Sequence, residues 1–295
     1  MNKRTLAKCA AVCIGLLTSA VHAQFAAGAA AYRPAALHAR YVSLQPQLVD
    51  NPFRRPFVIL SEESSNDAQG ELFAVVPFSF SKVSEALASP VDWCDIFSLH
   101  LNTKYCKIQP DKEATALLLN VGKKFDQPLS SSFRLTFAWT LAEQQPDYLR
   151  VNLKADYGPF STHDYRISFE AIPLDDGTSF LHFSYAYGYG VVGKIAMLAY
   201  FGTTGRSKVG FTVTGKDATG NPQLIEGMRG LIERNTMRYF LAIETFLGAQ
   251  GTPKPARFEK RINDWFDAIE RYPRQLHEME KAEYLEMKRK EALRQ

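Results

Sequence analysis

The chain has 295 residues, of which 46% are hydrophobic and 12% aromatic, so it can build a sizeable core and is not a disordered protein. Its formal net charge is +4, and removing Lys3, Arg4 and Lys8 from that count leaves +1. The rest of the chain is therefore nearly neutral, and this balance excludes the strongly basic surface that a nucleic-acid partner requires.

The N-terminus has the three parts of a secretory signal peptide. A basic start is followed by a short apolar run over 10–20 and by the small-residue exit Val21-His22-Ala23. The run is too short to cross a bilayer of about 30 Å as a stable helix. We therefore expect residues 1–23 to be cleaved before Gln24, although an uncleaved anchor is the alternative. The mature chain is expected to be periplasmic or secreted, with no transmembrane segment.

Two of the four cysteines, Cys94 and Cys106, remain after this cleavage. In an oxidising compartment a single pair most simply forms a disulfide, which is worth about 3 kcal/mol for a loop of this size. A catalytic cysteine is the less favoured alternative, because its thiol would need protection from its neighbour. With His100 as the nearest histidine, the spacing also suits zinc poorly, and we expect no metal or other cofactor.

The first elements along the chain are predicted to be a lead-in, a hairpin and two helices. Residues 24–55 are rich in alanine and predict a poorly ordered lead-in with room for one short helix. The main domain is expected over 56–250. It begins with strands at 57–61 and 71–78 that flank a polar turn. A helix capped by Ser79 or Ser81 follows, and after Pro90 a second helix is expected over 91–99.

Alternating apolar residues then predict an antiparallel meander with one apolar face. The expected strands are 104–109, 114–121, 132–141, 148–155, 165–172 and 179–187. Gly188 and Gly190 end the alternation. The next expected elements are an apolar helix over 191–201, a strand over 206–214 and a long amphipathic helix from Asn221-Pro222 to Leu247.

The last segment, 251–295, is highly charged and predicts a helical extension. Thr252-Pro253-Lys254-Pro255 has the composition of a stiff linker, and two helices are expected after it. The second helix has little apolar content, which is typical of a solvated element. Docking of a protein partner on these helices is one alternative function for the chain.

This order of elements resembles the helix-grip arrangement of the START and polyketide-cyclase-like (SRPBCC) superfamily. The resemblance covers about 71–247 and depends on the strand-to-helix passage 78–83, on Trp93 and on the closing helix 224–247. It implies an α+β fold in which a curved antiparallel sheet wraps around the long helix and holds a lipid, sterol or other apolar molecule between them. The strand before Glu71, the segment 191–214 and the C-terminal helices are additions to that pattern. An antiparallel sheet capped by helices without a cavity is the competing fold.

The candidate site consists of aromatic and polar side chains on the predicted apolar faces. Phe133, Phe137 and Trp139 form a stripe on one strand, and the run 185–190 alternates aromatic residues with small ones. Asn235, beside Arg238 on the long helix, has the chemistry to orient a ligand by one hydrogen bond. An ordinary packed core uses the same residue types. The predicted ligand-binding residues are Trp93, Phe133, Phe137, Trp139, Tyr185, Tyr187, Met228, Asn235 and Tyr239.

His182 is the one histidine with candidate catalytic neighbours, Glu170 and Asp164. It lacks a nucleophile motif and a second histidine at metal spacing, so we expect it on the solvated face of the sheet. His100 and His163 fall near strand ends without an assigned partner. The sequence thus favours a non-enzymatic binder of an apolar small molecule or lipid. The alternative is a cyclase- or hydrolase-like enzyme on the same scaffold, with His182, Tyr185 or Asn235 as members of a polar cluster in its pocket.

Overall fold

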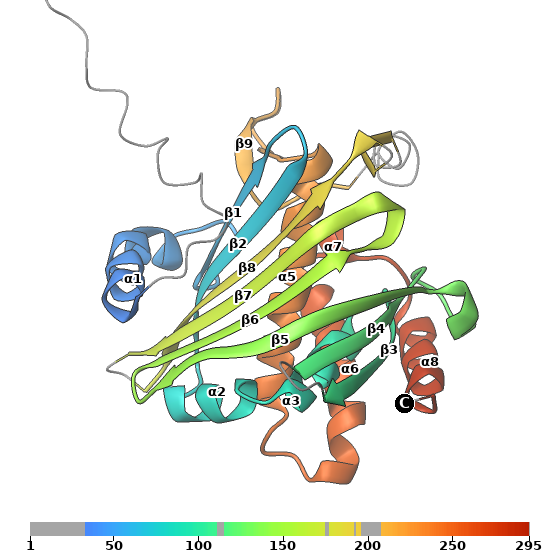
Figure 1. Ribbon diagram of the computed structural model, residues 1–295. Helices are drawn as coiled ribbons and strands as arrows, with labels where there is room; N and C mark the ends of the chain where they lie inside the picture. The colour runs from blue at the N-terminus through green and yellow to red at the C-terminus, as the bar shows by residue number, and fades with distance from the viewer. Residues whose placement is uncertain (1–32, 111–114, 175–176, 192, 196–207, 295) are drawn as a thin grey trace, which may run out of the picture. The chain divides into compact units, whose positions relative to one another are not determined.

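The computed structural model describes residues 33–110, 115–174, 177–191, 193–195 and 208–294. The predicted signal peptide, and most of the helix expected over 191–201, lie outside these residues. The centre of the fold is an eight-stranded antiparallel sheet in the order β1-β2-β8-β7-β6-β5-β4-β3 (Figure 1). Its strands are β1 (Phe57–Glu63), β2 (Asp67–Val76), β3 (Thr103–Pro110), β4 (Thr115–Val121), β5 (Phe133–Gln145), β6 (Tyr148–Tyr157), β7 (Thr162–Pro173) and β8 (Ser179–Tyr189).

The predicted helix-grip arrangement is confirmed. Helices α2 (Phe80–Leu87) and α3 (Pro90–Leu99) follow the first hairpin, and the meander β3 to β8 follows them. The long helix α5 (Gly227–Gly248) then packs on one face of the sheet against β1, β2 and β8 (Figure 1). The predicted α+β class and the resemblance to helix-grip proteins therefore hold at the level of the fold. We call the face that α5 covers the inner face.

The opposite, outer face of the sheet is covered by α1 (Pro34–Val49), which contacts β1, β2 and β7. We expected this part of the lead-in to be poorly ordered apart from a short helix, whereas α1 has 16 residues. Leu37, Leu44 and Leu48 share one face of α1 and are buried in a second apolar cluster, which includes Phe73 and Phe180 of the sheet. Burial of these leucines explains why the segment is an ordered part of the fold.

The segment before α5 differs from its prediction. The expected strand over 206–214 is replaced by a small hairpin of β9 (Val213–Lys216) and β10 (Pro222–Leu224), and α5 begins at Gly227 instead of Asn221. The carboxylate of Asp217 accepts hydrogen bonds from the backbone N–H groups of Thr219 and Asn221, both at 2.9 Å. Asn221 thus closes a turn instead of capping a helix, because an Asp side chain competes well for nearby backbone donors.

The C-terminal extension forms α6 (Lys254–Ile269), α7 (Pro273–Leu276) and α8 (Lys281–Ala292). The predicted linker is wrong, because Pro253 and Pro255 belong to the start of α6, where proline suits the first turn. The predicted solvated helix is also wrong. Tyr284 of α8 is fully buried, and its hydroxyl donates to the carbonyl of Leu99 at 2.9 Å.

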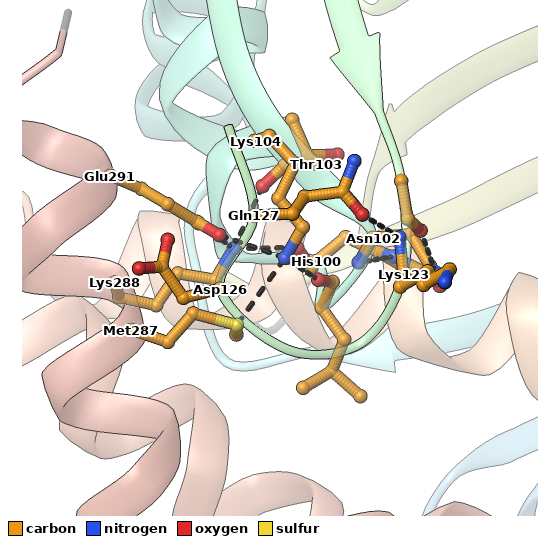
Figure 2. A network of polar contacts seen from close by, with 12 residues as sticks. His100, Asn102, Thr103, Lys104, Lys123, Asp126, Gln127, Met287, Lys288 and Glu291 are labelled. Carbon is orange, nitrogen blue, oxygen red and sulfur yellow. Dashed lines mark hydrogen bonds and ion pairs between the residues drawn. The ribbon is translucent and has the colours of Figure 1, made fainter. Parts of the chain in front are cut away.

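Two buried lysines fasten α8 to the start of β3 (Figure 2). Lys104 and Lys288 each donate to the carboxylate of Glu291, both at 2.8 Å. Lys288 also donates to the carbonyls of His100 and Thr103, at 2.7 and 3.0 Å. Charged groups are buried only when they are paired in this manner, so α8 is an integral part of the fold. No helix among the described residues is both long and apolar enough to cross a membrane.

Candidate ligand-binding site

A cluster of aromatic rings occupies the inner face between the sheet and α5. Alternate residues of a strand point to the same side, so Tyr185 and Tyr187 of β8 lie next to Tyr165 of β7. The ring centroids of Tyr165 and Tyr187 are 5.3 Å apart, and those of Tyr185 and Tyr239 are 5.4 Å apart. Because Tyr239 belongs to α5, this contact joins the sheet to the long helix. We call Tyr165, Tyr185, Tyr187 and Tyr239 the tyrosine cluster.

Helix α3 and strand β5 each add a phenylalanine ring next to the tyrosine cluster. Phe97 of α3 stacks on Phe137 at a centroid distance of 5.8 Å and meets the edge of Tyr239 at 5.6 Å. Phe137 in turn contacts Tyr165 at 6.3 Å. Such offset and edge-to-face geometries are the favourable ones for aromatic pairs. The inner face is therefore an aromatic surface to which three different parts of the chain contribute.

The structure brings five of the predicted ligand-binding residues together. Phe137, Tyr185, Tyr187 and Tyr239 are joined by ring contacts, and the hydroxyl of Tyr187 lies 3.6 Å from Sδ of Met228 on α5. Trp139 is buried on the same inner face, and its Nε1 has no hydrogen-bond partner among the described residues.

The other predicted residues have different surroundings. Phe133, at the start of β5, is 39% exposed. Trp93 is buried against Phe97, and its Nε1 donates to the carbonyl of Leu87 at 2.9 Å, so this indole holds α2 and α3 together. Asn235 is half-buried, and its Oδ1 accepts from Arg238 at 3.4 Å.

The tyrosine hydroxyls are the main polar groups of this site. Among the described residues, the hydroxyl of Tyr165 pairs with Thr162 at 2.7 Å and that of Tyr187 with Sδ of Met228 at 3.6 Å, and ring contacts join Tyr185 to Tyr239. Burial raises the pKa of Tyr185 and Tyr239, and it raises the pKa of Tyr165 to about 12. These hydroxyls therefore stay neutral at physiological pH. Tyr165 donates to Thr162, whose own hydroxyl donates to the carbonyl of Pro159, while Tyr185 and Tyr239 each carry one proton to donate. Apolar walls with a few neutral donors are suited to holding an apolar molecule.

A separate polar network lies on the outer face, beneath α1. The ring of His182 lies between two carboxylates: Nδ1 is 2.8 Å from Glu170 Oε2, and Nε2 is 3.2 Å from Glu71 Oε1. Tyr148 donates its hydroxyl to the other oxygen of Glu170. His182 is fully buried, so the predicted solvated position is wrong. The alternation of β8 predicted its face correctly, but α1 shields that face from water.

His182 carries a positive charge in this setting. Burial disfavours the charged ring, but hydrogen bonds to Glu170 and Glu71 outweigh burial and raise the pKa of His182 to about 9. Asp164, a predicted neighbour, instead pairs with Arg166 at 2.5 Å. His182 and Tyr185 point to opposite faces of β8, so they do not form one catalytic pocket. The network therefore has the features of a structural ion cluster.

The predicted disulfide is confirmed. Cys94 of α3 is bonded to Cys106 of β3, and their Cα atoms are 5.4 Å apart. The bond fastens α3 to the edge strand next to the aromatic surface. Among the described residues, no group of three or more histidine, cysteine or acidic side chains is arranged to hold a metal ion.

Comparison with known proteins shows similarity in structure alone. No family model matches the chain, and no curated protein matches its sequence. Truncated norcoclaurine synthase from Thalictrum flavum is similar over 47% of this chain and 86% of its own, with 13% identity and a TM-score of 0.34. Human StAR-related lipid transfer protein 5 has 10% identity, a TM-score of 0.31 and coverage of 57% and 87%, respectively. Ara h 8.0201 has 10% identity, a TM-score of 0.35 and coverage of 66% and 99%. These low values carry no conclusion about ligand or activity.

Proposed function

We propose that this chain is an exported binding protein that holds a lipid or other apolar small molecule between the inner face of the sheet and α5. The observation that carries the proposal is the polar chemistry of the tyrosine cluster. Buried polar groups in proteins nearly always have hydrogen-bond partners. Nε1 of Trp139 has none among the described residues, and the buried Tyr185 and Tyr239 present their hydroxyls on the same, mostly apolar face. A mostly apolar ligand with one acceptor would complement such a surface.

The binding function can be tested with the mature protein and a neutral fluorescent probe. Organic extraction followed by mass spectrometry should recover a co-purified apolar molecule, and N-phenyl-1-naphthylamine should be displaced by it. The variant Tyr239→Phe removes one inner-face hydroxyl and should weaken the binding of a ligand with an acceptor about 5- to 10-fold, a typical cost of one hydrogen bond. Tyr157→Phe is the matched control, because Tyr157 is 76% exposed. A protein that yields no ligand and binds no probe would refute the proposal.

Export is the second part of this proposal. It is supported by the basic start, the apolar run 10–20 and the exit Val21-His22-Ala23, and by the Cys94–Cys106 disulfide, which suits an oxidising compartment. Cell fractionation with intact mass measurement should find the protein outside the cytoplasm with Gln24 as its first residue. Recovery from the cytoplasm with residues 1–23 still attached would contradict it.

We propose neither a protein partner for the C-terminal helices nor an enzymatic reaction. The side chains expected to dock a partner are partly used inside the fold, as the buried Tyr284 and Lys288 illustrate. The histidine that the enzyme alternative would need in its pocket lies on the outer face of the sheet, with Glu71 and Glu170.

A further inference from the structure

Beside the tyrosine cluster, four segments meet around one carboxylate. Glu278, between α7 and α8, lies 2.7 Å from Nζ of Lys124 and 2.7 Å from Nη2 of Arg238. Nζ of Lys208 lies 3.5 Å from its other oxygen. We call Lys124, Lys208, Arg238 and Glu278 the basic junction. Three cations face a single carboxylate there, so the junction has an excess of positive charge.

This excess is only partly exposed to water. The side chains of Arg238 and Glu278 are 3% and 7% exposed, and that of Lys124 is 32% exposed. Burial, followed by the charge of Arg238, lowers the pKa of Lys124 to about 8. The same cations hold down the pKa of Glu278 to about 2, against the effect of burial. A second anion would thus be favoured at the junction, because shielded positive charge is costly without one.

Three buried nitrogens near the junction have no hydrogen-bond partner among the described residues. They are Nε of Arg238, Nε2 of His100 and Nε2 of Gln127. Gln127 already uses its Oε1 to accept from the N–H of Lys123 at 2.9 Å, so its unpaired atom is the amide nitrogen, a donor. The Arg238 nitrogen is a donor as well.

The third nitrogen, on His100, is a donor for a different reason. Burial and the charges of Arg238, Lys288, Lys124 and Lys104 hold the pKa of His100 well below 6.5, so the ring is neutral. Its Nδ1 accepts from the N–H of Asn102 at 3.2 Å, which assigns the single ring proton to Nε2. Figure 2 shows His100, Asn102 and Gln127 gathered beside Lys104 and Lys288. All three unpaired atoms therefore require an acceptor.

The basic junction is continuous with the tyrosine cluster. Arg238 and Tyr239 are consecutive residues of α5, and the ring of His100 stacks on that of Tyr239 at a centroid distance of 4.8 Å. Tyr239 in turn contacts Tyr185 at 5.4 Å. The aromatic surface thus has a basic, donor-rich end.

We propose that the ligand of the inner face is an acidic amphiphile, whose single carboxylate or phosphate headgroup is bound at the basic junction while its apolar chain lies along the tyrosine cluster. The proposal rests on the binding function above and adds the class of ligand to it. Arg238 already uses Nη1 and Nη2 on Asn235, Leu276 and Glu278, so it supplies its Nε–H donor, and Lys124 and Lys208 supply point charges.

The test compares ligands of equal chain length with different headgroups. Displacement of N-phenyl-1-naphthylamine from the mature protein would be measured with decanoate, decyl phosphate and 1-decanol. The acidic ligands should bind about 10- to 100-fold more tightly than the alcohol, as expected for hydrogen bonds to a charged group. Added salt should weaken the binding of decanoate and decyl phosphate and leave the binding of 1-decanol unchanged.

Variants locate the headgroup. Lys124→Met should lower the affinity for decanoate about 10-fold without affecting the affinity for 1-decanol. Lys123→Met, at the adjacent exposed position, should change the affinity for neither ligand. Lys208→Met provides a second change at the junction and should repeat the effect of Lys124→Met. Thermal melting of each variant, compared with the wild type, verifies that it folds.

The outcomes separate this inference from the binding function. Equal affinity for decanoate and 1-decanol would overturn the acidic headgroup and leave the binding function intact. Failure of every ligand and of the probe to bind would overturn both. If acetate or inorganic phosphate competed as well as decanoate or decyl phosphate, the junction would be a small-anion site, and the amphiphile would be overturned.

Discussion

His182 and Phe183 are neighbours on β8, and they point to opposite faces of the same sheet. Phe183 faces α5 and lies 6.1 Å from Tyr239, ring centroid to ring centroid, among the aromatic residues of the inner face. His182 faces α1 and is held between Glu170 and Glu71. Both side chains are at most 1% exposed.

The difference lies in the partners of the polar groups around each side chain, although Ser184 Oγ, on the same face as His182, also has no partner among the described residues. On the outer face, both nitrogens of His182 have a carboxylate partner, and Tyr148 donates to Glu170. On the inner face, Nε1 of Trp139 has no hydrogen-bond partner among the described residues, and Tyr185 and Tyr239 contact each other through their rings. A satisfied network makes a rigid layer, whereas unpaired donors on an apolar surface are available to a ligand. Burial alone therefore does not separate a structural layer from a binding site.

The largest expected effect comes from substituting the two neighbours of β8. His182→Leu leaves Glu71 and Glu170 buried without a cation and should lower the free energy of unfolding by about 3–5 kcal/mol at pH 7. Phe183→Leu keeps an apolar side chain and should cost under about 2 kcal/mol. Urea denaturation measures both values. Equal costs would show that the outer network is not an ion cluster of the kind described.

The next effect tests whether α1 closes the outer face. Leu44→Ala removes a side chain that is 3% exposed and should cost about 2–4 kcal/mol, because it leaves a cavity above Phe73 and Phe180. Val42→Ala, at a position that is 51% exposed, is the matched control and should change stability by less than about 0.5 kcal/mol. Similar small values for both variants in urea denaturation would mean that α1 does not shield His182.

Most of the strands could be predicted from the sequence, because their side chains alternate. The residues of 132–141, 148–155 and 179–187 predicted β5, β6 and β8. What the alternation does not record is the layer that covers the second face. The spacing of Leu37, Leu44 and Leu48 was a signal for α1, but alanine-rich surroundings obscured it.

The basic junction and the packing of α8 could not be predicted in this manner. Lys104 and its partner Glu291 are 187 positions apart, and Lys288 lies in a segment whose composition is typical of a solvated helix. A buried lysine has no local signature, because its burial depends on a carboxylate supplied by a distant segment. Lys124, Arg238 and Glu278 come together for the same reason, through the fold alone.

The buried histidines His182 and His100 are expected to differ in charge, because their pKa values are shifted in opposite directions. His182 should remain protonated at pH 8 and titrate near 9, whereas His100 should be neutral down to well below 6.5. The raised pKa of His182 contributes up to about 3 kcal/mol of stability below pH 6.5, which is lost as the pH rises through about 9. The lowered pKa of His100 has the opposite sign and removes stability as the pH falls below 6.5. NMR titration of the ring nitrogens measures both groups, and a His182 that titrates near 6.5 would contradict its pairing.

The smallest expected effect separates two tyrosine hydroxyls. Tyr148→Phe removes the donor to Glu170 and should cost about 1.5–3 kcal/mol, because hydrogen bonds to charged groups are the stronger ones. Tyr185→Phe removes a hydroxyl of the inner face and should change the free energy of unfolding by less than about 1 kcal/mol. Its effect should appear instead as weaker binding of a ligand that carries an acceptor, measured by displacement of N-phenyl-1-naphthylamine. If Tyr185→Phe cost as much stability as Tyr148→Phe and left binding unchanged, the inner hydroxyl would be a structural group, and the distinction between the two faces would fail.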